Sequence, residues 1–151
     1  MALRGTKLVA SDASRVTICI DDTSEYEYSG RIYSPYLPEI VTFTSVMHMI
    51  DILETFFDDI NYPQAYYATR NFDKPQSATL RGADVSLTRY HQPGEEPVLS
   101  GKHATFLLHV RFRHNATWQG SVKWVEQDES HDFRSILEFI KISNQMLSET
   151  V

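Results

Sequence analysis

The chain has 151 residues, a formal net charge of -6 and a sequence pI of about 5.4. This length supports one domain whose core needs no metal or disulfide, and the acidic balance argues against a general nucleic-acid coat protein, which needs a basic field. Cys19 is the single cysteine, which excludes an intramolecular disulfide and paired-cysteine zinc or redox motifs.

The chain also lacks signals for export or membrane insertion. Met1 to Arg15 contains no apolar run of the length found in a signal peptide. No apolar stretch approaches the ~20 residues that a membrane helix requires. Together with the lone cysteine, these observations predict a cytoplasmic protein that does not associate with membranes.

The first half of the chain predicts two strands followed by a helix. Val16 to Asp21 is typical of a strand, Asp22 to Glu25 of a turn, and Tyr26 to Tyr33 of the returning strand. Two prolines keep Ser34 to Ile40 out of regular structure.

An apolar stripe at helical spacing then predicts the helix, with Thr42 or Thr44 as its N-cap. Three residues widen this stripe beyond one face and predict an interaction surface: Met49, Ile52 and Phe56. The stripe itself consists of Phe43, Val46, Met47, Ile50, Leu53, Phe57 and Ile60.

The segment from Asn61 to Gly101 joins the two halves and carries most of the prolines and glycines. Asn61 to Phe72 is aromatic, and we expect it to pack on the helices. Ala78 to Tyr90 alternates enough for one extra strand or a hairpin. Gln92 to Lys102 is predicted to be an exposed, mobile loop.

The second half predicts the same order of elements. Leu108, Val110 and Phe112 alternate with His109, Arg111 and Arg113, which is typical of a half-buried strand. His114 and Asn115 predict a hairpin turn, and Thr117 to Glu126 predicts the returning strand. An apolar stripe from Phe133 to Leu147 predicts a helix, with Asp132 as its N-cap.

The two halves align without a gap at an offset of 90 residues, with 16–57 over 106–147. Six positions are identical, and most other apolar positions coincide. A repeat of this length is typical of a copied supersecondary unit. We therefore expect one α+β domain, 1–151, in which two strand-strand-helix repeats form an antiparallel sheet, with both helices on one face and a pseudo-twofold axis between the copies. The identical pairs are Gly30 and Gly120, Glu39 and Glu129, Phe43 and Phe133, Ser45 and Ser135, Ile50 and Ile140, and Ile52 and Ile142.

Two motifs of the second half resemble those of a known group of sequences. They are Asn115-Ala116-Thr117-Trp118-Gln119-Gly120 and Phe133-Arg134-Ser135 with Leu137-Glu138. With the proline-containing run before the first helix and Pro63-Gln64-Ala65 after it, the chain resembles a family of small uncharacterised bacterial proteins. The resemblance covers most of the chain except the Asp73 to Lys102 loop. It supports the repeated unit and implies no activity or catalytic residue.

The strongest candidate for chemistry is the polar face of the second hairpin. Four of its side chains would form a compact cationic patch for phosphate or carboxylate: His109, Arg111, Arg113 and Lys123. The alternative is a solvated sheet face. In that case the acidic positions of the first copy, among them Asp21 and Glu27, would neutralise the patch through cross-strand ion pairs.

The sequence predicts no catalytic residue, metal site or cofactor. It lacks a glycine-rich phosphate loop and the common hydrolase and zinc-protease motifs. Its six histidines match no common zinc spacing. We therefore expect a non-catalytic interaction or regulatory module whose partner is a second copy or an unidentified protein. The alternative is a protein that binds an anionic ligand or, less favoured because of the net charge, nucleic acid.

Overall fold

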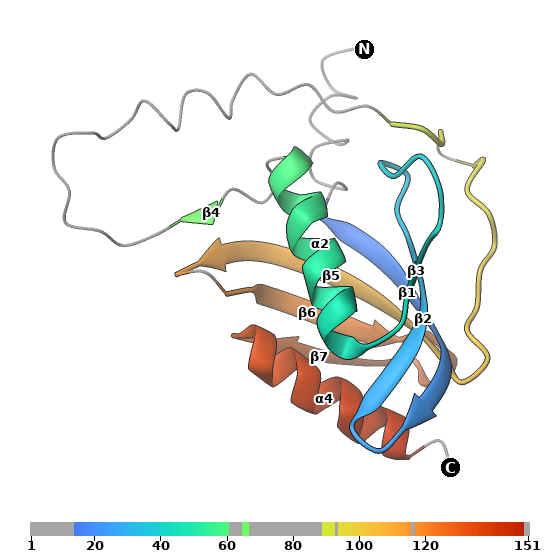
Figure 1. The fold of residues 1–151 in the computed structure, drawn as a ribbon, viewed down its shortest axis with the longest axis vertical. Helices are drawn as coiled ribbons and strands as arrows, with labels where there is room; N and C mark the ends of the chain where they lie inside the picture. The colour runs from blue at the N-terminus through green and yellow to red at the C-terminus, as the bar shows by residue number, and fades with distance from the viewer. Residues whose placement is uncertain (1–13, 61–64, 67–88, 93, 116, 150–151) are drawn as a thin grey trace, which may run out of the picture.

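A computed structural model describes residues 14–60, 65–66, 89–92, 94–115 and 117–149 and has an α+β fold (Figure 1). Six strands form an antiparallel sheet in the order β3-β2-β1-β5-β6-β7, and β4 pairs with β5 in parallel. The elements are β1 (Arg15–Ser24), β2 (Glu27–Tyr33), β3 (Val41–Phe43), α2 (Val46–Ile60), β4 (Ala65–Tyr66), β5 (Ala104–His114), β6 (Gln119–Trp124), the 3-10 turn η1 (Val125–Gln127), β7 (Glu129–Phe133) and α4 (Ile136–Ser148).

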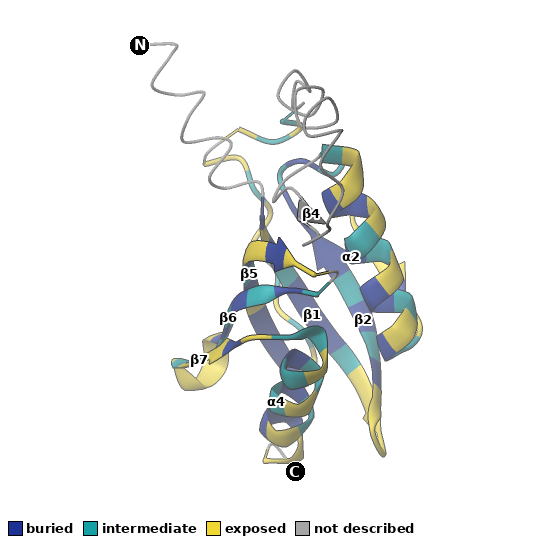
Figure 2. Cartoon of the chain, turned by 90° about the vertical axis from the view of Figure 1, so that its left-hand side faces the viewer, coloured by how far each residue is buried: buried dark blue, intermediate teal, exposed yellow. Residues whose placement is uncertain are grey.

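Alternation along the strands determines which side chains enter the core. In β1, Val16, Ile18 and Ile20 are buried, and their neighbours in sequence point to the opposite face of the sheet. Trp118 and Trp124 of the second half are also buried in the core. These residues form one apolar cluster with the buried sides of α2 and α4 (Figure 2). We call the side of the sheet that carries this cluster the core face.

Gly30 and Gly120 occupy two equivalent places where the backbone leaves no room for a side chain. Gly30 lies opposite Phe43, and Gly120 lies opposite Phe133. A Cβ on Gly30 would lie 1.7 Å from the carbonyl oxygen of Cys19, and a Cβ on Gly120 would lie 1.9 Å from that of His109. Each glycine therefore permits close approach of the neighbouring strand.

A bulge in β5 corrects the predicted alternation of the second hairpin. The pairing of β5 with β6 shifts between Val110 and Phe112, so the residues beyond the bulge change faces. Phe112, predicted to be buried, is 64% exposed, whereas Arg113 is 3% exposed. The pairing of β1 with β2 shifts at the corresponding place, between Ile20 and Asp22.

Both helices begin later than the sequence predicts, because their N-caps are Ser45 and Ser135. The Ser135 side chain accepts a hydrogen bond from the Glu138 N–H at 3.0 Å, and the Ser45 side chain accepts one from the His48 N–H at 3.1 Å. These contacts are typical of N-cap residues. The predicted caps Thr42, Thr44 and Asp132 are therefore wrong.

The order of elements predicted for each half also lacks one strand that the structure contains. Short strands precede each helix, and Phe43 and Phe133 end these strands instead of beginning the helices. β3 has three residues and β7 carries mostly polar side chains, so neither produces an alternating apolar pattern. The order of elements is therefore strand-strand-strand-helix in each half.

The interaction surface predicted on the first helix is corrected by its burial. Met49 and Phe56 are 0% and 5% exposed and belong to the core, and Ile52 is partly buried against it. The buried residues of α2 follow a single helical stripe, which consists of Val46, Met49, Ile50, Leu53, Phe56 and Phe57. Met49 and Phe56 therefore do not form an exposed surface of this chain.

The connection between the halves is described in part. The predicted strand or hairpin at Ala78 to Tyr90 lies outside the described residues apart from its last two positions. We call residues 89–92 and 94–103 the strap. It was predicted to be a mobile loop, but hydrogen bonds attach it to β1, to β5 and to the loop after β2.

Within the described residues, the structure contains no helix that is long and apolar enough to cross a membrane.

Candidate functional site

The sheet face opposite the core face carries the candidate site, and strand register builds its floor. Residues directly opposite one another on paired strands point to the same side of a sheet. Two such rows cross the centre of this face, which we call the pocket face. One row is Tyr33, Thr17, Leu107, Lys123 and Ser130, and the next is Arg15, His109 and Ser121.

All eight residues line a pocket of about 640 Å³. Its walls come from the strap and the loop after β2, through Pro35, Arg89, Glu96, Pro97 and Leu99. Leu107 and Val125 are 43% and 41% exposed, so the pocket offers apolar surface beside its polar groups. A volume of this size is within the range of small-molecule sites.

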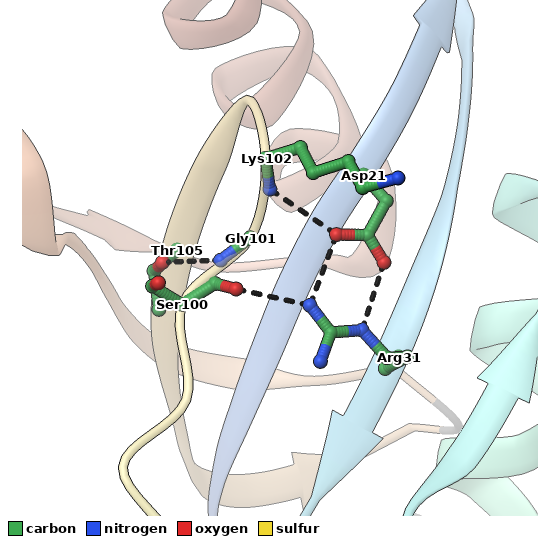
Figure 3. Close-up of polar contacts among 6 residues, drawn as sticks. All are labelled: Asp21, Arg31, Ser100, Gly101, Lys102 and Thr105. Carbon is green, nitrogen blue, oxygen red and sulfur yellow. Dashed lines mark hydrogen bonds and ion pairs between the residues drawn. The ribbon is translucent and has the colours of Figure 1, made fainter.

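The far end of the strap is held on the first half of the pocket face by a network around Asp21 and Arg31 (Figure 3). The Arg31 guanidinium donates two hydrogen bonds to the Asp21 carboxylate, at 2.8 and 3.0 Å, and a third to the Ser100 carbonyl at 2.9 Å. The Lys102 N–H donates to Asp21 at 3.1 Å. The strap therefore covers Asp21 and Arg31 on this half of the face.

Thr105 extends this network across to β5. Its hydroxyl accepts from the Gly101 N–H at 2.9 Å and donates to the Glu126 carboxylate at 2.6 Å. Cys19 lies between Arg31 and Thr105 in the strand order and is fully buried. Burial raises the pKa of the Cys19 thiol, with Arg31 acting in the opposite direction, so the thiol is kept protonated under the strap.

The near end of the strap packs on the loop after β2 and on Tyr33. The Tyr90 N–H donates to the Pro35 carbonyl at 2.7 Å, and Arg89 forms an ion pair with Glu96 at 3.0 Å. The Arg89 guanidinium also lies 5.4 Å from the centre of the Tyr36 ring. These contacts fix Arg89 in the pocket wall with only 10% of its side chain exposed.

Tyr33 contributes a buried polar atom to the pocket. The residue is 6% exposed, and its hydroxyl has no hydrogen-bond partner in the described part of the chain. Burial raises the pKa of Tyr33, Glu96 adds to this effect, and Arg89 opposes it. The hydroxyl therefore stays neutral and can donate a hydrogen bond. A buried polar group without a partner is costly unless a ligand or water satisfies it.

Three of the four cationic residues predicted from the sequence are on the pocket face. His109 and Lys123 line the pocket, and Arg111 lies beside it, with a hydrogen bond to Ser121 at 3.2 Å and an ion pair with Asp132 at 3.3 Å. Lys123 also forms an exposed ion pair with Asp128 at 3.2 Å.

Arg113 is not part of the patch, which corrects that prediction. Beyond the bulge its side chain points to α2, where it pairs with Asp58 at 2.8 Å and Glu54 at 3.4 Å. The ion pairs also differ from those predicted between the acidic residues of the first copy and the basic residues of the second. Asp21 pairs with Arg31 and Asp132 pairs with Arg111, each within its own half of the chain.

Sequence reasoning missed Arg15, Tyr33, Arg89 and Glu96. Arg15 and Tyr33 are the sequence neighbours of core residues in their strands. Because side chains alternate between the two faces of a sheet, this position alone could have placed both residues on the pocket face. Arg89 and Glu96 reach the sheet through the strap, and no local pattern predicts where an irregular segment docks.

Among the residues that the structure describes, no group of three or more His, Cys, Asp or Glu side chains is placed to hold a metal ion. The resemblance to a bacterial family stays a prediction. Comparison of the chain with protein-family models, with curated proteins and with solved structures gives no match.

Proposed function

We propose that this protein binds a small anionic ligand with an apolar body, of the kind formed by a carboxylate on an aromatic or aliphatic chain, in the pocket of its sheet face. One observation carries the proposal. Among the residues that the structure describes, four basic side chains from four elements line one pocket, together with the carboxylate of Glu96. They are Arg15, Arg89, His109 and Lys123.

This gathering of basic side chains at one pocket favours an anion, although the protein as a whole has a net charge of -6. Arg and Lys form shorter and stronger hydrogen bonds with carboxylate or phosphate than neutral groups do. The Tyr33 hydroxyl, buried at the edge of the same pocket, adds a neutral donor. These groups support binding through the charged end of a ligand.

The apolar lining supports the second part of the proposal. Leu99, Leu107 and Val125 line the pocket together with two prolines. Apolar surface of this kind gains about 25 cal/mol per Å² when a ligand covers it. An inorganic ion would leave this surface in water, so a ligand with a hydrocarbon body fits better than free phosphate.

The proposal can be tested with a matched pair of probes, 4-phenylbutyrate and 4-phenylbutanol, which differ in the charged group. Isothermal titration should show that the acid binds at least about tenfold more tightly, equivalent to about 1.4 kcal/mol. The variant with His109→Gln and Lys123→Gln should lose most of that difference. Binding of the acid should also weaken as salt is raised, because the cations are partly exposed.

Arg134→Gln is the control, because it removes one positive charge at an exposed residue outside the pocket. It should leave both affinities unchanged. Equal affinities for the acid and the alcohol, or no binding of either at millimolar concentration, would contradict the proposal.

We further propose that the fold is a duplicated unit with a pseudo-twofold axis at Thr17 and Leu107 and both helices on the core face. The pairing of β1 with β5 supports the axis, because its partners exchange when the offset of 90 is applied: Val16 pairs with Leu108, and Ile18 with Phe106.

Two crossed contacts support both parts of this proposal. The Tyr28 hydroxyl bonds Ser143 of α4 at 2.8 Å, whereas the Trp118 indole N–H donates to Glu54 of α2. Each copy's central aromatic residue therefore reaches the other copy's helix. Trp118 also packs on Phe57 of α2 and Phe139 of α4, which supports placing both helices on one face.

Self-association is the second proposal, and exposed apolar residues favour it. Met47 and Leu137 are 67% and 60% exposed in the first turns of α2 and α4, although Met49 and Phe56 are buried. Sedimentation at several protein concentrations tests it, and a monomer throughout would exclude it. Nucleic acid fits the pocket face less well, because the chain has a net charge of -6 and Arg113 points away from this face to α2.

A further inference from the structure

We propose that a groove beside α4 binds an extended peptide from a partner protein, which adds a short parallel strand to the tip of β1. The groove has a volume of about 850 Å³ and lies between the β1–β2 hairpin and α4. Thr23 and Ser24 form one side, and Leu137, Ile140 and Leu147 form the other. None of these residues lines the pocket of the sheet face.

The second half of the chain contains a template for this mode of binding. β4 adds to β5 in parallel, with Ala65 opposite Arg113 and Tyr66 opposite His114. Because β6 occupies one edge of β5, β4 takes the edge that continues beyond the pairing with β1 (Figure 1). This is strand addition to a short exposed edge, a common mode of peptide recognition.

Thr23 and Ser24 occupy the same place on β1 that Arg113 and His114 occupy on β5. Each pair follows a bulge and precedes the hairpin turn. On one edge, Thr23 and Ser24 pair with Tyr28 and Glu27 of β2. Within the described ranges, no strand pairs with their other edge. Its backbone groups are therefore available to a further strand.

A difference in side-chain size explains why the groove is open at α4 and filled at α2. The Arg113 guanidinium lies 5.7 Å from the centre of the Phe57 ring and pairs with Asp58, so it fills the space between hairpin and helix. Thr23, at the corresponding place, is much shorter. The space beside Thr23 stays open, and Leu137, which is 60% exposed, is one of the apolar residues that line it.

The occupant follows from the lining of the groove. Its backbone must be extended to pair with Thr23 and Ser24, and a large apolar side chain fits over Leu137, Ile140 and Leu147. A second copy of this chain has its own β4 paired with its own β5, so it does not offer that segment. We therefore assign the groove to a segment of a different protein.

A synthetic peptide with the sequence Asn61 to Ala68 serves as the probe, because it contains the two residues that form the template strand. Added to the ¹⁵N-labelled full chain, it should shift the amide signals of Thr23, Ser24 and Leu137 saturably. Leu137→Lys should weaken the binding about tenfold or more. A peptide with prolines in place of Ala65 and Tyr66 should not bind, because proline lacks the N–H donor.

Met47→Lys is the matched control, since Met47 is the exposed residue at the same position of α2. This variant should bind the peptide as the parent chain does. The proposal is overturned if the peptide causes no shifts at its solubility limit, or if the shifts persist in Leu137→Lys. It is also overturned if the Thr23 and Ser24 signals depend on protein concentration without peptide, because a second copy then occupies the edge. The peptide titration is independent of the ligand proposed for the pocket, so a failure to bind 4-phenylbutyrate does not contradict the peptide proposal.

Discussion

The two halves of the sheet share their backbone pairing but differ in what covers the pocket face. In the first half, the strap lies over Asp21 and Arg31 and is hydrogen bonded to both. In the second half, His109, Arg111 and Lys123 face a pocket or solvent. The face is thus covered at Asp21 and Arg31 and open at the pocket, whose floor also includes Thr17 and Tyr33 of the first half. The difference shows that similar strand pairing in the two halves is compatible with different surfaces, because the side chains on this face and the strap above it differ.

The hairpin tips repeat this contrast in the opposite sense. Arg113 closes the space between its hairpin and α2, and Thr23 leaves the corresponding space beside α4 open. The space beside α2 is therefore filled by a side chain, whereas the groove beside α4 is accessible.

The largest expected effect tests the part that the halves share. Gly30→Ala and Gly120→Ala should each destabilise the fold by more than about 4 kcal/mol or prevent folding, because the new Cβ would overlap the backbone of the neighbouring strand. Chemical unfolding of purified variants measures this. Gly94→Ala should cost only about 1 kcal/mol, since Gly94 has positive φ but no atom within 4 Å of an added Cβ. A large difference between Gly30→Ala and Gly120→Ala would contradict the proposed equivalence.

A smaller effect is expected where the halves differ in the core. Glu54→Ala removes the acceptor of the fully buried Trp118 indole N–H and one partner of Arg113. The free energy of unfolding should fall by about 2 kcal/mol, the cost of leaving a buried donor without a partner. Asn144→Ala, at the corresponding place in α4, should change it by less than about 0.5 kcal/mol. Equal losses at the two positions would show that Glu54 has no special role.

The smallest effect concerns the attachment of the strap. Hydrogen bonding from Arg31 is the main cause that holds the pKa of Asp21 below its ordinary value of 3.8, and burial opposes it. A carboxylate with a lowered pKa contributes stability above its unfolded pKa and loses it as the pH falls through its folded pKa. Between pH 6 and pH 3, the free energy of unfolding should therefore fall further in the parent chain than in Asp21→Asn. The additional loss should be about 1 kcal/mol or less. Identical losses in unfolding free energy would mean that the pair contributes nothing.

Local patterns predict much of the fold and only part of the candidate site. Alternation correctly predicts that Leu108 and Val110 are buried, and the period of the helices is recovered because their apolar stripes are long. The two-residue alternation predicts the wrong face for Phe112 and Arg113, because a bulge moves every later residue of the strand to the opposite face. β3 and β7 are missed because short or polar edge strands have no apolar alternation. The pocket wall is missed because Arg89 and Glu96 reach Tyr33 through long-range contacts.

The most direct test of the proposed function is an amide-shift titration of the ¹⁵N-labelled full chain with 4-phenylbutyrate. The proposal predicts saturable shifts at Thr17, Tyr33, Leu107 and Lys123, which come from four strands and together line the pocket. These shifts should be reduced in the variant with His109→Gln and Lys123→Gln. Shifts confined to the groove of Thr23 and Leu137, or no saturable shifts at any residue, would contradict the assignment of the pocket as the ligand site.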